Sequence, residues 1–419
     1  MSVRPILASG AVLLTAALAL SGCSTSPSSN SKGDSTITFL SPYTKEVTQP
    51  LLKKFEDSHS GITVKTSYQA ADTQQLLVTQ LSAGTAPDVM FLNSGSGAPT
   101  SVDVLAAKGY LTDLSDSAWA NKIPKAYKPF LSHDGKVYAF PSTILGIGAI
   151  YNKTALEKAQ LVPPTTWKEV LSFCSAAKSK GVTAFSAGLN TGWIAPLVAY
   201  SLASTLVDKP DPSFNSKIGT SSSFADSKWV DTLTKYKQMD EAGCFQHDAT
   251  GTDGDTSLKA VAKGDALAVV NVSAVLSTVK GYADKGTEFE ILPLPATNNA
   301  ADTAMPATLS STMGINAKTK NMRVAREFVD WMSEPAQLAG ISEGQGGTLP
   351  TIVGNSFKSP AVLATFEQFS NNNRTTPVSS AKWPNAQISD ALMAGVQGMF
   401  LGKMTPLQVA QSMDDAAKK

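Results

Sequence analysis

Residues 36–66 read TITFLSPYTKEVTQPLLKKFEDSHSGITVKT and predict a strand, a helix and a second strand in that order. Residues 36–40 have the short apolar pattern of a strand, and residues 61–66 repeat it. Between these two runs, apolar residues recur at the spacing of one helix face: Val47, Leu51, Leu52 and Phe55. This order of elements predicts an α/β fold with parallel strands joined by a right-handed crossover.

The same alternation continues beyond residue 66. A helix is expected over residues 73–83, and the run of residues 88–92 predicts a third strand. In parallel sheets of this kind, ligands bind beyond the carboxyl ends of the strands. The loops after the three strands supply these candidate ligand-binding residues: Tyr43, Gln69, Asn93 and Ser94. Serine and asparagine also form ordinary turns, and that alternative stays open.

The start of the chain predicts export. Behind the single cation Arg4, residues 5–20 form an uncharged apolar tract, which is shorter than the roughly 20 residues that cross a bilayer as a helix. We interpret residues 1–22 as a signal peptide. The ending LSGC, residues 20–23, resembles the bacterial lipobox, in which the cysteine receives a diacylglyceryl group and becomes the new N-terminus.

We therefore expect a lipid on Cys23 and a location on the extracellular face of the cell membrane. Residues 23–35 are rich in serine and predict a flexible tether. The alternative is an ordinary signal peptide, with Cys23 a bystander.

The other two cysteines, Cys174 and Cys244, are an even pair in an exported chain, which predicts a disulfide. Cys174 lies in a predicted helix that begins after the capping residue Thr166, and Cys244 follows a helix predicted over residues 226–242. Two separate buried thiols are the alternative. Without clustered histidines, a metal site is not expected.

Charge narrows the class of ligand. The formal net charge is +1, and removal of residues 1–22 takes away Arg4 alone of the charged residues, so the remaining charge is balanced. That balance argues against nucleic acid as a partner. Only three further arginines, Arg323, Arg326 and Arg374, offer the bidentate fork that captures carboxylate or phosphate, so a neutral ligand fits better.

Six segments in order resemble the extracellular solute-binding proteins of bacterial ABC sugar importers, the family that contains maltose-binding protein. These segments are SAGTAPDV (82–89), DGKVYAFP (134–141) with IYNK (150–153), PTTWKE (164–169), VAKGDAL (261–267) and AREFVDWMS (325–333). The resemblance implies a type II periplasmic-binding-protein-like fold, with two lobes joined by a hinge of several crossovers and a ligand cleft between them. The implied divisions are 36–142 plus 296–338 for one lobe and 143–295 plus 339–419 for the other.

The resemblance also implies a function and further site residues. A sugar would be captured by hinge closure and delivered to the permease subunits of an importer, by a protein expected to be a monomer. Trp193 and Trp383 fall near positions where relatives place a sugar-stacking ring, although packing in the core is the alternative for both. Gly346 and Gly347 lie in a loop that resembles the re-entry into the second lobe, where backbone amides can approach a ligand.

The sequence departs from the family pattern at two places. Where many relatives have a Gly-x-Trp turn, this chain has Asn271-Val272-Ser273, and the first crossing at Ser142-Thr143 lacks the carboxylate of maltodextrin binders. These departures favour a smaller sugar, or a ligand held mostly by hydroxyl and amide groups, and Thr143, Asn271 and Ser273 are candidate binding residues for it.

The sequence leaves two alternatives from other classes. A secreted carbohydrate-active hydrolase remains open, because the paired carboxylates of a glycosidase have no short signature. However, the chain has neither a Gly-x-Ser-x-Gly elbow nor an HExxH motif, and it has no Walker lysine or GxGxxG fingerprint, so no enzyme activity and no cofactor are expected. The same fold could bind a non-sugar solute such as a polyamine, but the candidate loops have few carboxylates.

Overall fold

The strand-helix-strand order expected over residues 36–66 is present in the computed structural model. The structure describes residues 35–68, 73–125, 127–352 and 357–419. Cys23 and Gln69, with the proposed signal peptide and nearly all of the tether, lie outside the described residues. No helix among the described residues is long and apolar enough to cross a membrane.

The strands are β1 (Ser35–Ser41), β2 (Ile62–Tyr68), β3 (Val89–Leu92), β4 (Ser132–His133), β5 (Lys136–Val137), β6 (Ala139–Asn152), β7 (Thr183–Ser186), β8 (Ala266–Val272), β9 (Phe289–Leu292), β10 (Met305–Ile315), β11 (Leu349–Pro350) and β12 (Thr375–Pro377). The helices are α1 (Lys45–Ser58), α2 (Thr73–Ala83), α3 (Val102–Ala107), α4 (Lys153–Ala159), α5 (Trp167–Ser179), α6 (Leu197–Ala203), α7 (Lys228–Glu241), α8 (Gly254–Lys263), α9 (Leu276–Tyr282), α10 (Met322–Met332), α11 (Pro335–Gln345), α12 (Ala364–Asn371), α13 (Gln387–Phe400) and α14 (Pro406–Ala417).

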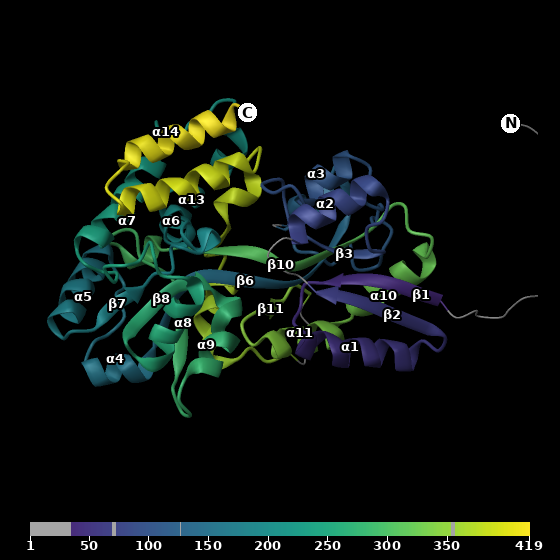
Figure 1. Cartoon of the computed structure of the whole chain (residues 1–419), viewed down its shortest axis with the longest axis horizontal. Coiled ribbons are helices and arrows are strands. Elements are labelled where there is room, and N and C mark those ends of the chain that lie inside the picture. The colour runs from purple at the N-terminus through teal and green to yellow at the C-terminus, as the bar shows by residue number, and fades with distance from the viewer. Residues whose placement is uncertain (1–34, 69–72, 126, 353–356) are drawn as a thin grey trace, which may run out of the picture. The chain divides into compact units, whose positions relative to one another are not determined.

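The central sheet has the strand order β2-β1-β3-β10-β6-β8-β7. Strands β1, β2 and β3 are mutually parallel where they pair, as predicted. Strand β10 then runs antiparallel to β3 and to β6, which makes the sheet mixed. Figure 1 shows β6 and β10 in the middle, between β1–β3 on one side and β7 and β8 on the other.

Strand β6 belongs to both halves of this sheet. Its residues 139–146 pair with β10, and its residues 147–152 pair with β8 and β9. All fourteen residues of β6 are buried, so the strand is covered on both faces and its burial does not alternate along the chain. The chain therefore crosses between the two halves along a fully buried strand.

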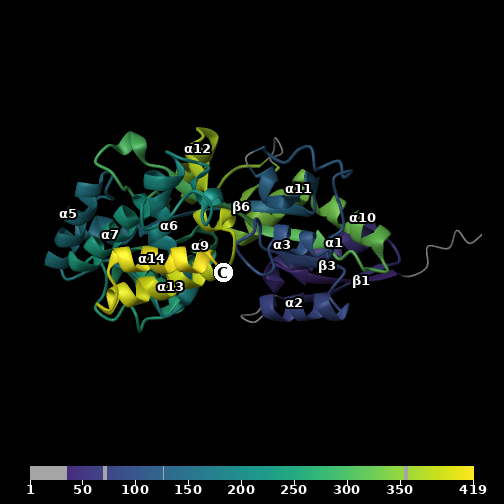
Figure 2. The ribbon, with the colours of Figure 1, turned by 90° about the horizontal axis from the view of Figure 1, so that it is seen from above.

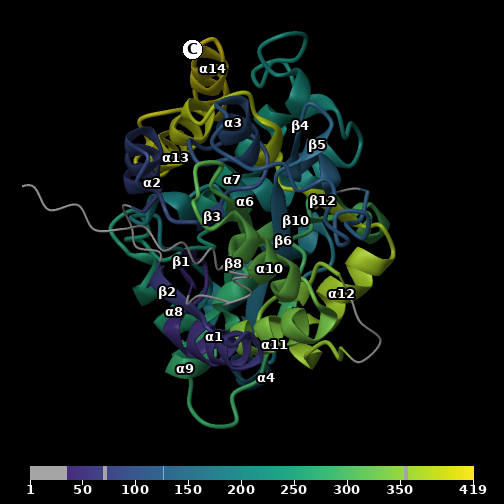
Figure 3. The same ribbon diagram turned by 90° about the vertical axis from the view of Figure 1, so that its right-hand side faces the viewer.

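Helices cover both faces of the sheet half that contains β1–β3. Helices α1 and α11 lie on one face, and α2 and α3 lie on the other, as the two views agree (Figures 1 and 3). Seen from above, α5, α6, α7, α13 and α14 gather over the other half (Figure 2). The apolar side chains form two buried clusters, and β6 contributes to both, with Ile144 and Ile150 in one and Leu145, Ile147, Ala149 and Tyr151 in the other.

The helices that local sequence patterns predict are present in the structure. Helix α1 buries Thr48, Leu51, Leu52 and Phe55, the face that the apolar spacing predicts. Helix α2 occupies the predicted residues 73–83. Helix α5 begins with the predicted capping box between Thr166 and Glu169. Helix α7 is capped by Ser227 and is slightly shorter than predicted.

Candidate functional site

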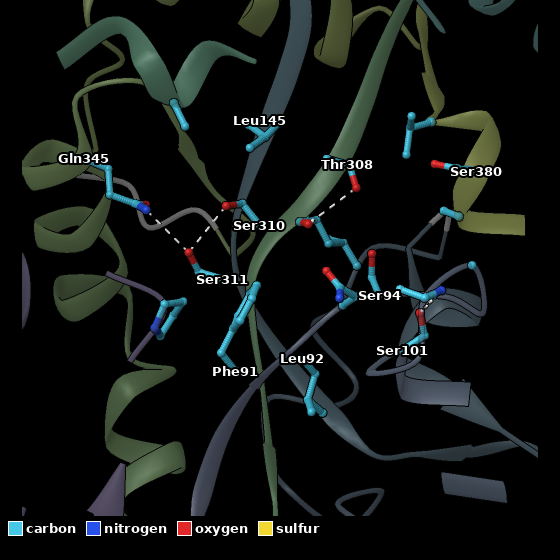
Figure 4. Close-up of a pocket in the computed structure, with 18 residues that line it drawn as sticks. Phe91, Leu92, Ser94, Ser101, Leu145, Thr308, Ser310, Ser311, Gln345 and Ser380 are labelled. Atoms are coloured by element: carbon cyan, nitrogen blue, oxygen red, sulfur yellow. Dashed lines mark hydrogen bonds between the residues drawn. The ribbon is translucent and has the colours of Figure 1, made fainter. Parts of the chain in front are cut away.

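A cavity of about 370 Å³ lies where β3 and β10 pass the end of α11 (Figure 4). Its wall comes from seven parts of the chain that are separated in sequence. The lining residues are Pro42, Phe91, Leu92, Asn93, Ser94, Gly97, Ala98, Ser101, Leu145, Ala274, Thr308, Leu309, Ser310, Ser311, Gln345, Val378, Ser380 and Ala381. Two of the three loops predicted from the strand ends, those after β1 and β3, therefore reach this cavity.

The cavity wall is polar but uncharged. None of the described residues that line it has a charged side chain; six have hydroxyl groups, and two, Asn93 and Gln345, have amides. Among these lining residues, only Phe91 has an aromatic ring. Hydroxyl and amide groups both donate and accept hydrogen bonds, so this wall can pair with the hydroxyls of a neutral ligand. It has no charge to offset that of an ionic ligand.

Strand β10 contributes the adjacent residues Ser310 and Ser311. Their hydroxyl oxygens are 3.4 Å apart, and Gln345 Nε2 lies 3.4 Å from Ser311 Oγ, within donating distance. Figure 4 shows Gln345 and Ser310 both linked by dashed lines to the hydroxyl of Ser311, on one side of the cavity. Ser311 has a φ of +56°, so its backbone is in the left-handed region.

Tyr43 lies beneath this wall and not in it. Its ring is buried, and its hydroxyl donates to Ser142 Oγ at 2.7 Å; Ser142 Oγ in turn donates to the carbonyl of Ser311 at 2.9 Å. Burial raises the pKa of Tyr43, so the phenol keeps its proton and remains a donor. The expectation of direct ligand contact at Tyr43 is corrected here, because the hydroxyl is used inside the protein.

Asn93 and Ser94 lie in the cavity wall, where the loop after β3 was expected to bring them. Asn93 Nδ2 donates to Thr100 Oγ1 at 2.8 Å, which fixes the amide and leaves its oxygen to accept.

Thr143, Asn271 and Ser273 are buried beside the cavity but do not line it. Thr143 Oγ1 is 3.4 Å from Gln345 Oε1, and Ser273 Oγ accepts from the backbone N–H of Gly146 at 3.1 Å. Asn271 Nδ2 is buried without a hydrogen-bond partner among the described residues. These side chains support the wall; they do not form it.

Gly346 and Gly347 have packing roles in the structure. Gly346 ends α11 with a φ of +66°, the usual conformation of a C-terminal glycine cap. A Cβ on Gly347 would lie 2.0 Å from the carbonyl oxygen of Ser273, so the chain passes too closely for any side chain. The lining residue from this segment is the preceding Gln345.

The two predicted tryptophans have different environments. Trp193 is 51% exposed within a short 3-10 turn, Gly192–Ile194, and its ring is free to stack, although it does not line the cavity. Trp383 is fully buried, packs on Tyr200 and Trp229, and donates its Nε1–H to Asn215. The expectation of a sugar-stacking ring at Trp383 is therefore corrected: the indole is part of the core.

The backbone before Trp383 nevertheless forms one side of the cavity. Ser96 N donates to the carbonyl of Ala381 at 3.3 Å, and Ser96 Oγ donates to the carbonyl of Trp383 at 2.8 Å. A Cβ on Gly97 would lie 2.2 Å from the carbonyl oxygen of Ser380. The loop after β3 thus meets this segment backbone to backbone.

A buried carboxylate holds the same segment from behind. Asp208 accepts from Ser379 Oγ at 2.9 Å and from Asn215 Nδ2 at 2.6 Å. Its burial raises its pKa to about 7, while these two hydrogen bonds and the charge of Lys382 act in the opposite direction. Ser379 begins the 3-10 turn Ser379–Lys382 that lies behind Ser380 and Ala381.

Cys174 and Cys244 form the predicted disulfide, with their Cα atoms 4.7 Å apart. Both residues are buried in the second apolar cluster, where the bond ties α5 to the end of α7. Among the residues that the structure describes, no group of three or more His, Cys, Asp or Glu side chains is arranged to hold a metal ion.

Sequence reasoning missed the β10 residues Thr308, Ser310 and Ser311. One signal was available: Ser310-Ser311-Thr312 is a run of hydroxyl residues inside an otherwise apolar strand. Buried hydroxyls need partners, so such a run in a core strand marks a polar surface.

Comparisons with known proteins agree on one family. The family model of the bacterial extracellular solute-binding proteins matches residues 41–339, more than half of the chain. The multiple sugar-binding protein of Streptococcus mutans is 27% identical over 343 residues, which cover 77% of each chain. The melibiose/raffinose/stachyose-binding protein MelE of Bacillus subtilis is 23% identical, over 78% of this chain and 76% of its own.

Solved structures show the same fold. The solute-binding protein RafE in complex with raffinose has a TM-score of 0.76 at 20% identity, covering 92% of this chain and 99% of its own. A chitin oligosaccharide binding protein has a TM-score of 0.78 at 18% identity, covering 91% and 98%.

Proposed function

The chain belongs to the family of bacterial extracellular solute-binding proteins, and from that premise we propose that it binds a neutral sugar and delivers it to an ABC importer. The observation that carries the proposal is the uncharged wall of hydroxyls and amides around the cavity at β10. Sugars present many hydroxyls, and a buried hydroxyl left unpaired costs about 1–3 kcal/mol. A wall dense in small polar groups meets that requirement.

The size of the cavity favours a mono- or short oligosaccharide. At about 370 Å³ it lies near the lower end of the range of roughly 300–1,000 Å³ that is usual for small-molecule sites. The lack of carboxylates in the described wall argues against a polyamine, which would need several of them. The relative named for melibiose, raffinose and stachyose suggests these three sugars as the first ligands to test.

We propose the two-lobe division 36–142 plus 296–338 and 143–295 plus 339–419, with closure around the ligand. The pairing of β6 with β10 on one side and with β8 on the other supports a hinge at this crossing. Ligand-driven closure of this kind turns on a few residues at the ends of elements.

For the localisation and oligomeric state of the protein, we propose a lipid on Cys23 that tethers a monomer to the outer face of the cell membrane. The lipobox-like ending at residues 20–23 and the serine-rich stretch behind it support this. Mass spectrometry of the membrane-extracted protein should find acyl chains on an N-terminal Cys23. A mature N-terminus without acyl mass contradicts the anchor and leaves sugar binding unaffected.

The decisive experiment measures thermal unfolding with a panel of glucose, sucrose, melibiose, raffinose and stachyose, and with spermidine as a charged control. A ligand at a hundred times its Kd adds about 2.7 kcal/mol to the stability of the native state, so a true ligand raises Tm. We expect a shift with at least one sugar and none with spermidine. The reverse pattern, or release of hydrolysis products from any of these sugars, would contradict the proposal.

A further inference from the structure

Ser310 and Ser311 do not follow the rule of strand geometry. Successive side chains of a regular strand point to opposite faces of the sheet. Here both neighbours line one cavity, and their hydroxyl oxygens are 3.4 Å apart (Figure 4). The left-handed backbone at Ser311, with a φ of +56°, turns the strand between them and puts both side chains on one side.

The ladder between β6 and β10 is interrupted at the same point. Ser310 pairs with Thr143 and Thr312 pairs with Pro141, while Ser311 has no backbone pair on β6. The turn therefore removes Ser311 from the regular hydrogen bonding of the sheet.

Side-chain hydroxyls take over the missing contact. Ser142, the β6 residue between the two paired positions, donates its hydroxyl to the carbonyl of Ser311 at 2.9 Å, and Tyr43 donates to Ser142 at 2.7 Å. Tyr43 and Ser142 are both buried, so this relay is shielded from water. A left-handed serine is strained, and it persists only where its surroundings hold it.

We propose that the turn at Ser311 is a binding device that presents the Ser310 and Ser311 hydroxyls together to two adjacent hydroxyls of the sugar. Tyr43 and Ser142 are positioning residues that hold the turn without touching the ligand. This inference rests on the proposed function and names the residues that would recognise the sugar hydroxyls. Adjacent hydroxyls on a sugar ring are close enough for each to bond one member of this serine pair, and Gln345 offers a third group beside them.

The backbone part is tested without any ligand, by the melting temperatures of Ser311→Gly and Ser311→Ala. Glycine adopts a positive φ freely and alanine does not, so Ser311→Gly should melt above Ser311→Ala, by on the order of 1 °C in a chain of this size. Ser310 is the matched control, because its φ is not positive. There the order should reverse, since glycine weakens an ordinary strand. If the Gly and Ala variants show the same order of melting temperatures at Ser310 and Ser311, the proposed strained turn at Ser311 is refuted.

The relay is tested by repeating the Ser311 pair in a Tyr43→Phe background. The loss of the phenol hydroxyl releases the turn, so the difference in Tm between Ser311→Gly and Ser311→Ala should shrink. An unchanged difference overturns the positioning role of Tyr43, because a phenylalanine that merely lowers stability would move both variants equally.

The ligand part is tested by titrating the five panel sugars against wild type, Ser310→Ala and Ser311→Ala. For the sugar that wild type binds, each variant should lose about five- to tenfold in affinity, the usual loss for a removed hydrogen bond. Binding that survives both substitutions unchanged overturns this inference and leaves the proposed function standing. A wild type that binds none of the sugars overturns both.

Discussion

Replacement of Asp208 by asparagine should make the protein more stable at neutral pH, not less. Asp208 is only 5% exposed, and its carboxyl group lies behind the segment that forms one side of the cavity. Asparagine is close in shape, and its oxygen can accept from Asn215 as the carboxylate does. The hydroxyl of Ser379 can rotate from donating to accepting, so both hydrogen bonds survive.

The expected magnitude follows from the pKa of Asp208. Burial raises this pKa from 3.8 to about 7 in the folded protein, so the neutral form is favoured on folding. Stability from this group is full below pH 4 and falls as pH rises towards 7, because the ionised form is penalised only when folded. A shift of this size corresponds to on the order of 4 kcal/mol. Among neighbouring groups, Lys382 opposes the shift, and Lys209 and Arg374 line the same small cavity.

Urea unfolding of wild type and Asp208→Asn at pH 5 and at pH 8 measures the effect. The gain in unfolding free energy from the substitution should be about 2–3 kcal/mol larger at pH 8 than at pH 5. The control is Asp211→Asn, three residues further along the chain, where hydrogen bonds from Ser213 lower the pKa of the exposed carboxyl, so its effect should not change over this range. If Asp208→Asn gave no larger gain in unfolding free energy at pH 8 than at pH 5, burial would not control the pKa of this carboxyl and the reasoning would fail.

Three further predictions follow from the geometry. Gly97→Ala should weaken sugar binding by more than tenfold in calorimetry, because its Cβ would lie 2.2 Å from a backbone oxygen of Ser380, and unchanged affinity would show that this contact is dispensable. Replacement of Cys174 and Cys244 by serine should lower the unfolding free energy by about 4 kcal/mol, the entropy expected for their separation of 70 residues, as urea titration can measure; a loss under 1 kcal/mol would count against it. Trp193→Ala should leave Tm unchanged, because the ring is half exposed, but should weaken binding by on the order of 1 kcal/mol, and an unaltered Kd removes Trp193 from the site.

The elements that could be predicted from the sequence are those whose signal is local. The apolar face of α1 and the capping box at Thr166 both lie within a few residues, so they needed no knowledge of the rest of the chain. The disulfide was predictable because only two cysteines remained for it in the exported chain. The position of Asn93 and Ser94 in the cavity wall was predictable because loops at the strand ends follow from the topology of the sheet; their contact with a ligand stays a prediction.

The rest of the site depends on contacts between distant segments. Trp383 stands next to Pro384, a true loop signal, but α6 and α7 supply Tyr200 and Trp229 to bury its ring. Tyr43 follows a strand end, as a ligand-binding residue should, yet Ser142, 99 residues later, takes its hydroxyl. In both cases the residue type suited the predicted ligand-binding role. A partner remote in sequence instead engages the side chain inside the protein.

The position of the polar wall links ligand binding to the proposed hinge. Ser310 and Ser311 lie on β10, and Leu145 on β6, which are the two strands that join the halves of the sheet. A movement of one half against the other must twist these strands, and the left-handed turn at Ser311 sits where their ladder is already interrupted. We propose that the spacing of the two serine hydroxyls changes with the angle between the halves, because the turn at Ser311 lies at this interruption of the ladder. A ligand that bonds both hydroxyls has different affinities for the two arrangements, and such a difference is what allows binding to shift the equilibrium towards closure.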